Sequence, residues 1–164
     1  MSERKIIFLT GATGFLGSHL TARLLQDGHH VRILARSSKS ASAKSRVEDV
    51  LREVGGTRFE NLEVFEGDIS LPDLGLNEAD RKSIVSSTDE VWHCAASLSF
   101  QEEDREEIFR MNLNGTRHVL DLVKQTPARR LHHVSTAYIA GNRSDVALET
   151  EIDVGQTFKN AYEE

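Results

Sequence analysis

The sequence predicts an α/β fold in which a doubly wound parallel sheet carries helices on both faces. Short apolar runs alternate along the chain with segments of helical period, which is the pattern of repeated βαβ units. The first run, Ile6 to Thr10, leads through a glycine turn into Leu16, Leu20 and Leu24 at helical spacing. Five strands joined by right-handed crossovers predict the strand order 3-2-1-4-5, that of a Rossmann-type sheet.

Composition limits the class of protein. The chain has 164 residues, enough for one domain with a core, and a net charge of −6 from 20 basic and 26 acidic residues. This balance argues against a nucleic-acid partner, and no apolar run approaches the roughly 20 residues of a membrane span. Cys94 is the single cysteine, and the N-terminus runs directly into the first strand without a signal sequence. We therefore expect a cytoplasmic protein.

The glycine turn after the first strand predicts a phosphate-binding loop. Gly11, Gly14 and Gly17 are spaced three apart between the strand and the helix. Gly11 would allow the tight turn, Gly14 would let the backbone approach a pyrophosphate, and Gly17 would bring the helix close to the strand. The alternative is a packing turn without a ligand. We expect cofactor contacts from Gly11, Thr13, Gly14, Phe15, Leu16 and Gly17.

The second strand, Val31 to Ala35, ends at Arg36. An acidic residue near this position would accept the ribose 2′-hydroxyl of NAD, whereas arginine accommodates a 2′-phosphate, so we expect NADP(H). A polar loop over 37–46 follows, and Val47, Val50, Leu51 and Val54 then predict a helix that stops at Gly55-Gly56. Arg46 could reach the same phosphate from the start of this helix or be solvated.

The third strand covers Leu62 to Phe65, and it ends in Gly67-Asp68-Ile69. Asp68 and Ile69 should meet the adenine at the carboxyl edge of the sheet, although an aspartate in a turn or a helix cap is the alternative. A loop over 72–75 and a helix over 76–87 follow. The fourth strand, Asp89 to Ala96, ends in small residues that allow a ribose or pyrophosphate to lie close, namely Ala95, Ala96 and Ser97.

The longest helix is predicted over 102–125, with a buried seam that includes Met111, Gly115 and Val119. Gly115 is best explained by close packing, and Asn112 lies near the seam, where it could bridge backbone groups beside the active site. The fifth strand, 130–140, runs into a loop, and the polar stretch NRSDVALETEID after Gly141 is also expected to be loop before the chain ends in FKNAYEE. We expect no metal site, because His93 and Cys94 lack partners at ligand spacing.

These segments together resemble the extended short-chain dehydrogenase/reductases, and within them the thioester-reductase and fatty-acyl-coenzyme-A-reductase (male-sterility, NAD-binding) branch. The matching motifs are FLTGATGFLG, LAR, FEGDIS, VWHCAASLSF, NLNGT, HHVSTAYIAG and FKNAYEE. The resemblance implies that NADPH reduces an acyl thioester, linked to coenzyme A or a carrier protein, to an aldehyde or alcohol. It also implies Thr136 as the catalytic hydroxyl, with Ser135 as the fallback, and Tyr162 as the catalytic tyrosine.

The family's catalytic lysine, four residues after the tyrosine, would fall two residues beyond Glu164. We therefore expect residues 1–164 to be the NAD(P)-binding Rossmann domain of a longer reductase, cut before the lysine and the substrate-binding segment. Tyr162 would then lie in a frayed chain end, and this segment would have little activity alone. The alternatives are a nucleotide-sugar epimerase or dehydratase of the same superfamily and a dinucleotide-binding module without catalysis.

Overall fold

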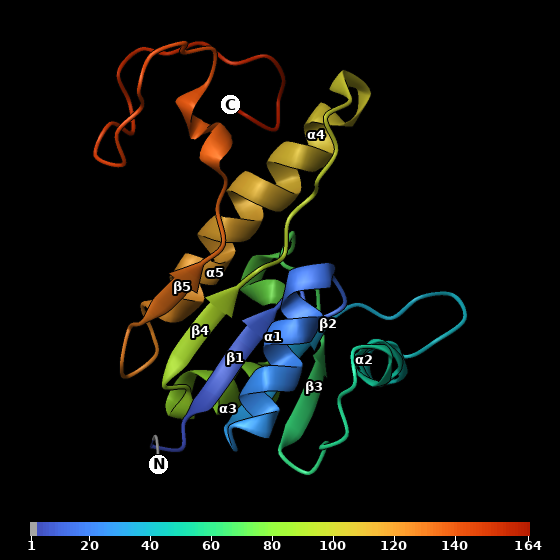
Figure 1. The fold of residues 1–164 in the computed structure, drawn as a ribbon. Helices are drawn as coiled ribbons and strands as arrows, with labels where there is room; N and C mark the ends of the chain where they lie inside the picture. The colour runs from blue at the N-terminus through green and yellow to red at the C-terminus, as the bar shows by residue number, and fades with distance from the viewer. Residues whose placement is uncertain (1–2) are drawn as a thin grey trace.

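A parallel five-stranded sheet lies between two layers of helices in the computed structural model, which describes residues 3–164 (Figure 1). The strands are β1 (Ile6–Thr10), β2 (His30–Ala35), β3 (Leu62–Glu66), β4 (Glu90–His93) and β5 (Leu131–His133). Their order is β3-β2-β1-β4-β5, and every neighbouring pair is parallel. The predicted α/β class and strand order are confirmed.

Alternate residues of the strands face two separate hydrophobic cores. Ile7 and Leu9 of β1 join the core beneath α1 (Phe15–Gln26) and α2 (Ala43–Glu53), whereas Phe8 joins the core beneath α3 (Glu78–Ser87) and α5 (Gly115–Val123). Because the side chains of a strand alternate between its faces, a strand buried on both sides is apolar throughout. This is why β1 is an unbroken apolar run rather than an alternating one.

The buried face of α1 differs from the predicted stripe. Leu16 is half exposed and Leu20 is only partly buried, whereas the buried positions are Gly17, Ser18, Thr21, Leu24 and Leu25. The helix turns small residues toward β1 at its N-terminal end and leucines only at its C-terminal end. This arrangement lets the helix approach the sheet closely at the glycine turn and frees Leu16 to face outward.

The helix predicted over 102–125 is interrupted. It consists of a 3₁₀ turn (Glu102–Asp104), α4 (Arg105–Ile108), a π-helical segment (Phe109–Asn114) and α5. The Thr116 hydroxyl donates to the carbonyl of Asn112 at 2.6 Å, and the Asn112 side chain is engaged outside the helix. A π-helical segment adds a residue to one turn and changes the direction of the side chains that follow. The spacing of apolar residues in the sequence did not reveal this insertion.

Two predicted strands are shorter than expected, because the chain leaves the sheet at β4 and β5 to form the site described below. The fourth ends at His93 rather than Ala96, and the fifth covers only Leu131–His133 before a 3₁₀ turn at Ala137–Ala140. The segment predicted as a loop at 72–75 is a 3₁₀ turn in which Asp73 and Leu74 have positive φ. Leu74 is fully buried in this turn.

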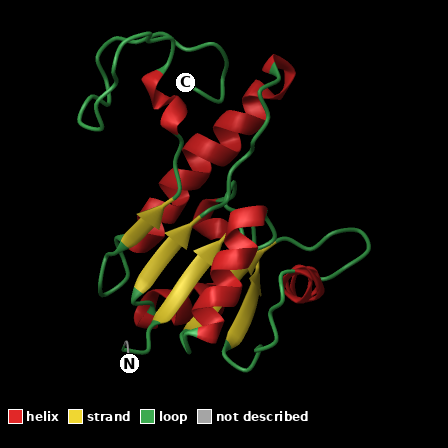
Figure 2. Cartoon of the chain, in the orientation of Figure 1, coloured by secondary structure: helices red, strands yellow, loops and turns green. Residues whose placement is uncertain are grey.

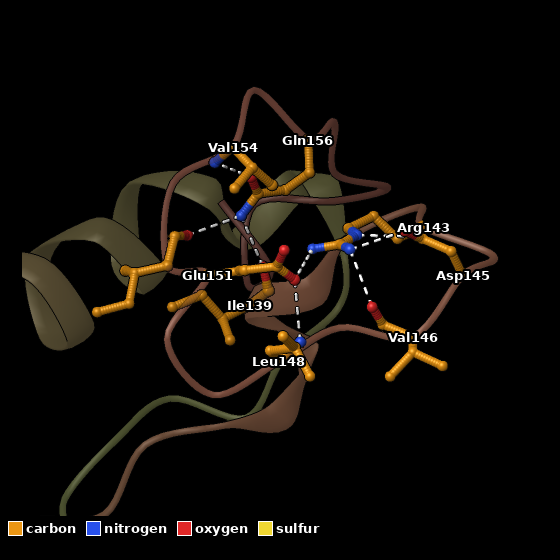
Figure 3. A network of polar contacts seen from close by, with 9 residues as sticks. Ile139, Arg143, Asp145, Val146, Leu148, Glu151, Val154 and Gln156 are labelled. Atoms are coloured by element: carbon orange, nitrogen blue, oxygen red, sulfur yellow. Dashed lines mark hydrogen bonds and ion pairs between the residues drawn. The ribbon is translucent and has the colours of Figure 1, made fainter.

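Residues 141–164 contain no helix or strand, which confirms the loop predicted over 142–153, and Figure 2 shows them as a loop beyond the carboxyl ends of the strands. Side chains hold this loop together (Figure 3). Arg143 bonds Asp145 and Glu151 at 2.8–3.0 Å, and Glu151 accepts the backbone N–H of Leu148 at 3.0 Å. The Gln156 amide donates to two carbonyls at 2.9 Å. Because the loop contains no helix or strand to hold its backbone, these side-chain contacts fix its path.

A buried histidine ties the centre of the sheet to α5. His93 Nδ1 lies 2.7 Å from Thr10 Oγ1, and its Nε2 lies 3.2 Å from Thr116 Oγ1. Because the Thr116 hydroxyl already donates to Asn112, Nε2 carries the proton and Nδ1 accepts from Thr10. Burial, and then the neighbouring His133, lower the pKa of His93 from 6.5 to about 4. His93 is therefore a neutral structural residue at physiological pH.

We expect His93 to make folding sensitive to mild acid. As the pH falls from 6.5 toward 4, the unfolded chain binds a proton that the folded chain does not, so the free energy of unfolding decreases, by up to about 3 kcal/mol. His93→Gln should lower stability at pH 7 and reduce this slope. Urea unfolding at a series of pH values measures it, with exposed His19→Gln as the control. An unchanged slope in His93→Gln would contradict the assignment.

Candidate functional site

A cavity of about 440 Å³ lies at the carboxyl ends of the strands, where ligands bind in open α/β sheets. Its walls come from the glycine turn, the start of α1 and the segments that follow β2, β3 and β4. Twelve of the fourteen predicted cofactor residues line it: Gly11, Thr13, Gly14, Phe15, Leu16, Gly17, Arg36, Arg46, Asp68, Ile69, Ala95 and Ala96. The remaining two, Ser97 and Asn112, are not part of its wall.

The three glycines differ in what surrounds them. A Cβ on Gly17 would lie 2.1 Å from the carbonyl oxygen of Gly11, and one on Gly11, at φ +84°, would lie 2.6 Å from the nitrogen of Ala95. A Cβ on Gly14 would meet only Gly11 O, at 3.4 Å, and would otherwise extend into the open cavity. Gly11 and Gly17 are thus required by packing, whereas Gly14 leaves room for a ligand.

The start of α1 supplies the groups that an anion needs. Gly14 is the N-cap and no side chain caps this helix. Backbone N–H groups of the first turn and the positive end of the helix dipole therefore face the cavity. With no Cβ at Gly14 to hold a ligand away, this cradle fits the pyrophosphate of a dinucleotide.

Two arginines and an aspartate form the opposite end of the cavity. Arg36 Nη1 lies 3.6 Å from Asp68 Oδ2, and Arg46 donates to the backbone carbonyl of Arg36. Asp68 Oδ1 accepts the backbone N–H of Ser70 at 2.8 Å. Partial burial raises the pKa of Asp68, but the hydrogen bonds from Ser70 and the charges of Arg36 and Arg110 outweigh burial and hold it below 3.8. Asp68 is both a turn-capping residue and part of the cavity wall.

Asn112 fixes the segment after β4 through two hydrogen bonds to the backbone of Ser97. Its Oδ1 accepts the backbone N–H of Ser97 at 2.7 Å, and its Nδ2 donates to the Ser97 carbonyl at 3.1 Å. The two bonds fix the segment that follows β4, including Ala95 and Ala96 in the cavity wall. This is the backbone bridge that the sequence suggested for Asn112, and it holds Ser97 without placing either residue on the cavity surface.

The predicted catalytic residues lie outside the cavity wall. Thr136 Oγ1 accepts the backbone N–H of Tyr138 at 3.2 Å, and Ser135 is exposed beside it. The Tyr162 ring lies 4.8 Å from the Phe100 ring and 6.3 Å from the Tyr138 ring, measured between centroids. Tyr138 therefore brings the Tyr162 segment next to the Thr136 segment.

The expectation that Tyr162 lies in a frayed end is wrong. Ala161, the residue before it, is 4% exposed, and Arg105 Nη2 lies 2.6 Å from Glu164 Oε2. An aromatic cluster and an ion pair thus hold the last residues against the start of α4. Local sequence could not show this, because Phe100 and Arg105 lie about sixty positions before their partners Tyr162 and Glu164.

Sequence reasoning missed eight residues of the cavity wall. Five of them lie at strand ends within two positions of predicted residues, so their positions alone could have revealed them: Thr10, Leu34, Ala35, Gly67 and Cys94. The other three are apolar residues next to Ser97, Asn112 and Ser135, of which Met111 was predicted only as part of a buried helix seam: Leu98, Met111 and Val134. Burial raises the pKa of the Cys94 thiol, which keeps it protonated.

Within residues 3–164 no group of three or more histidine, cysteine, aspartate or glutamate side chains is placed to hold a metal ion. None of the helices there is long and apolar enough to cross a membrane.

The parallel sheet, the glycine cradle and the cavity at the carboxyl edge define a dinucleotide-binding Rossmann fold. Residues 9–164 match the NAD-binding family model described as male sterility protein, and the chain belongs to this family. Fatty acyl-CoA reductase 1 of Mus musculus is 33% identical over 156 residues, which cover 88% of this chain and 30% of that protein. The chain thus spans about a third of the length of this relative.

Solved structures show the same fold. The terminal R domain of the myxalamid PKS-NRPS biosynthetic pathway aligns with 99% of this chain and 43% of its own, at 26% identity and a TM-score of 0.84. The enzyme WbmG of Bordetella bronchiseptica, solved in complex with NAD, aligns with 99% of this chain and 46% of its own, at 25% identity and a TM-score of 0.73.

Substitution of two glycines should separate folding from ligand binding. Gly17→Ala forces α1 away from Gly11 and should lower the free energy of unfolding by about 2 kcal/mol or more. Gly14→Ala should change it by less than about 1 kcal/mol, because its Cβ has room, yet should weaken nicotinamide dinucleotide binding by filling the cradle. Urea unfolding and calorimetric titration test both. Unchanged dinucleotide affinity in Gly14→Ala would show that no pyrophosphate lies there.

Proposed function

We propose that this chain is the NADP(H)-binding part of a reductase that transfers hydride to an acyl thioester. The single observation that carries the choice of cofactor is the pair of arginines, Arg36 and Arg46, at one end of the cavity. The family match and the fatty acyl-CoA reductase relatives support the reaction class. Residues 1–164 are proposed as the NAD(P)-binding domain of a protein of the relatives' length, and a cytoplasmic location is proposed with it.

The residues of the cavity wall fit the pyrophosphate and the adenosine half of the proposed cofactor. The Gly14 cradle and the start of α1 would hold the pyrophosphate, and Arg36 would hold the 2′-phosphate through a charge-assisted contact. Arg36 is 55% exposed on its side chain and so remains reachable, while Arg46 fixes its backbone carbonyl. Asp68 and Ile69 of the cavity wall would border the adenine.

The proposed chemistry is hydride addition to a carbonyl, for which NADPH supplies the hydride when bound. Negative charge develops on the carbonyl oxygen as the hydride arrives. The Thr136 hydroxyl would orient that oxygen, with Ser135 as the fallback, and the Tyr162 hydroxyl would donate the proton that it needs. Collapse of the resulting hemithioacetal would release the thiol, with the hydroxyl proton passing to the departing sulfur, and give the aldehyde. A second hydride, from a second NADPH, and a second proton would give the alcohol.

Removal of the Arg36 guanidinium tests the cofactor preference. We expect Arg36→Ala to weaken NADPH binding about tenfold or more and to leave NADH binding within about twofold, since only NADPH carries the 2′-phosphate. Calorimetric titration of the 164-residue chain with both cofactors measures this. Arg52→Ala is the matched control, because Arg52 is also 55% exposed and ion-paired but lies outside the cavity wall. Equal affinity of the unsubstituted chain for the two cofactors would reject the proposal.

Tyrosine substitutions test the proton donor in a chain extended to the relatives' length. Tyr162→Phe should lower kcat with an acyl-coenzyme A at least about a hundredfold, because the phenol is the proposed acid. NADPH affinity should stay unchanged. Tyr138→Phe is the control from the same aromatic cluster and should keep most activity. The 164-residue chain alone should turn over far more slowly than the extended chain. Equal activity of Tyr162→Phe and the unsubstituted chain would show that another group supplies the proton.

A further inference from the structure

We infer that Arg110 and Ser70 are positioning residues that set the cofactor preference of this site by acting on Arg36 through Asp68. The inference rests on the proposed NADP(H) binding. It adds two residues that neither the glycine motif nor the strand-end arginine indicates, and one of them is more than seventy positions from Arg36.

A continuous line of polar contacts joins the four residues. Arg110 Nη1 donates to Ser70 Oγ at 2.8 Å, and the Ser70 backbone N–H donates to Asp68 Oδ1 at 2.8 Å. Asp68 Oδ2 lies 3.6 Å from Arg36 Nη1. The two carboxylate oxygens are thus divided, one toward Ser70 and one toward Arg36, so the carboxylate cannot turn toward Arg36 without losing its bond to Ser70.

Burial is greatest in the middle of this line. The side chain of Arg36 is 55% exposed and that of Asp68 is 21% exposed, Ser70 is 9% exposed as a whole residue, and Arg110 at the far end is exposed. Arg36 is therefore open to a ligand, and the link from Arg110 to Asp68 passes through the buried Ser70. Screening by water is weakest at Ser70.

The backbone of residues 68–70 is held by contacts that do not involve Arg110. His118 Nδ1 donates to the Ile69 carbonyl at 2.8 Å, and the Asp68 N–H donates to the Leu74 carbonyl at 2.8 Å. Gly115 lies so close that a Cβ there would be 2.9 Å from Ile69 Cδ1. Removing the Arg110 side chain should therefore leave this backbone in place and change only the charge around Asp68.

The direction of the effect follows from Coulomb's law. Asp68 attracts Arg36 and repels a 2′-phosphate, and the cation of Arg110 offsets part of that negative charge. Without Arg110, Asp68 would pair more strongly with Arg36 and would oppose the phosphate more strongly. Both changes weaken NADPH binding. NADH has no 2′-phosphate, so its binding should be unaffected.

The test is the ratio of NADPH to NADH dissociation constants, measured by calorimetric titration of the 164-residue chain. We expect Arg110→Gln to weaken NADPH binding about threefold, the scale of a partly screened charge, with NADH unchanged. Ser70→Ala, which removes the hydroxyl but keeps the backbone N–H, should shift the ratio in the same direction. Arg110→Lys should restore most of the preference. Arg117→Gln is the control, since Arg117 is exposed on the same helix and contacts Asn114 instead.

Two outcomes would overturn the inference: equal weakening of both cofactors in Arg110→Gln, which indicates a merely structural role, or no change in the affinity for either cofactor. Arg36→Ala separates this failure from that of the proposed function. If Arg36→Ala leaves the ratio unchanged, the NADP(H) proposal itself fails. If Arg36→Ala shifts the ratio and neither Arg110→Gln nor Ser70→Ala does, only the role of these positioning residues is wrong.

Discussion

The close approach of Gly17 to the carbonyl of Gly11 determines where α1 begins, and it thereby shapes the ligand cavity. A Cβ at Gly17 would lie 2.1 Å from that oxygen, so only glycine allows α1 to start where it does. This close approach places an uncapped helix N-terminus directly above the end of β1. The cavity, its open cradle at Gly14 and the exposed positions of Phe15 and Leu16 all follow from the same contact.

The other wall of the cavity depends on the interrupted helix that follows β4. Its π segment carries Arg110 and Asn112, which reach the chain after β3 and the chain after β4 respectively. Thr116, one turn later, joins His93 and hence the centre of the sheet. One helix thus fixes two strand-end segments relative to the glycine turn, and this relation sets the separation between the two ends of the ligand cavity.

The sequence indicated those features that depend on local pattern and chemistry. The strand order, the glycine cradle and Arg36 follow from hydrophobic runs, glycine spacing and the residue type at a strand end. The interruption of the helix at Phe109–Asn114 did not, because it depends on Asn112 meeting Ser97, which only the fold brings near. Tyr162 was misjudged for the same reason, since its packing partners Phe100 and Tyr138 are distant in sequence.

In the loop over residues 141–164, the side chains that fix the path of the backbone differ from the large apolar side chains that are exposed. Arg143, Glu151 and Gln156 fix its path, while Val146, Leu148, Ile152 and Val154 are 52–79% exposed. These four residues contribute to the framework only through backbone groups, which every residue type possesses. These exposed side chains can therefore change during evolution without a change in the path of the loop backbone. Proline is the exception at Leu148 and Val154, where the backbone N–H is a donor.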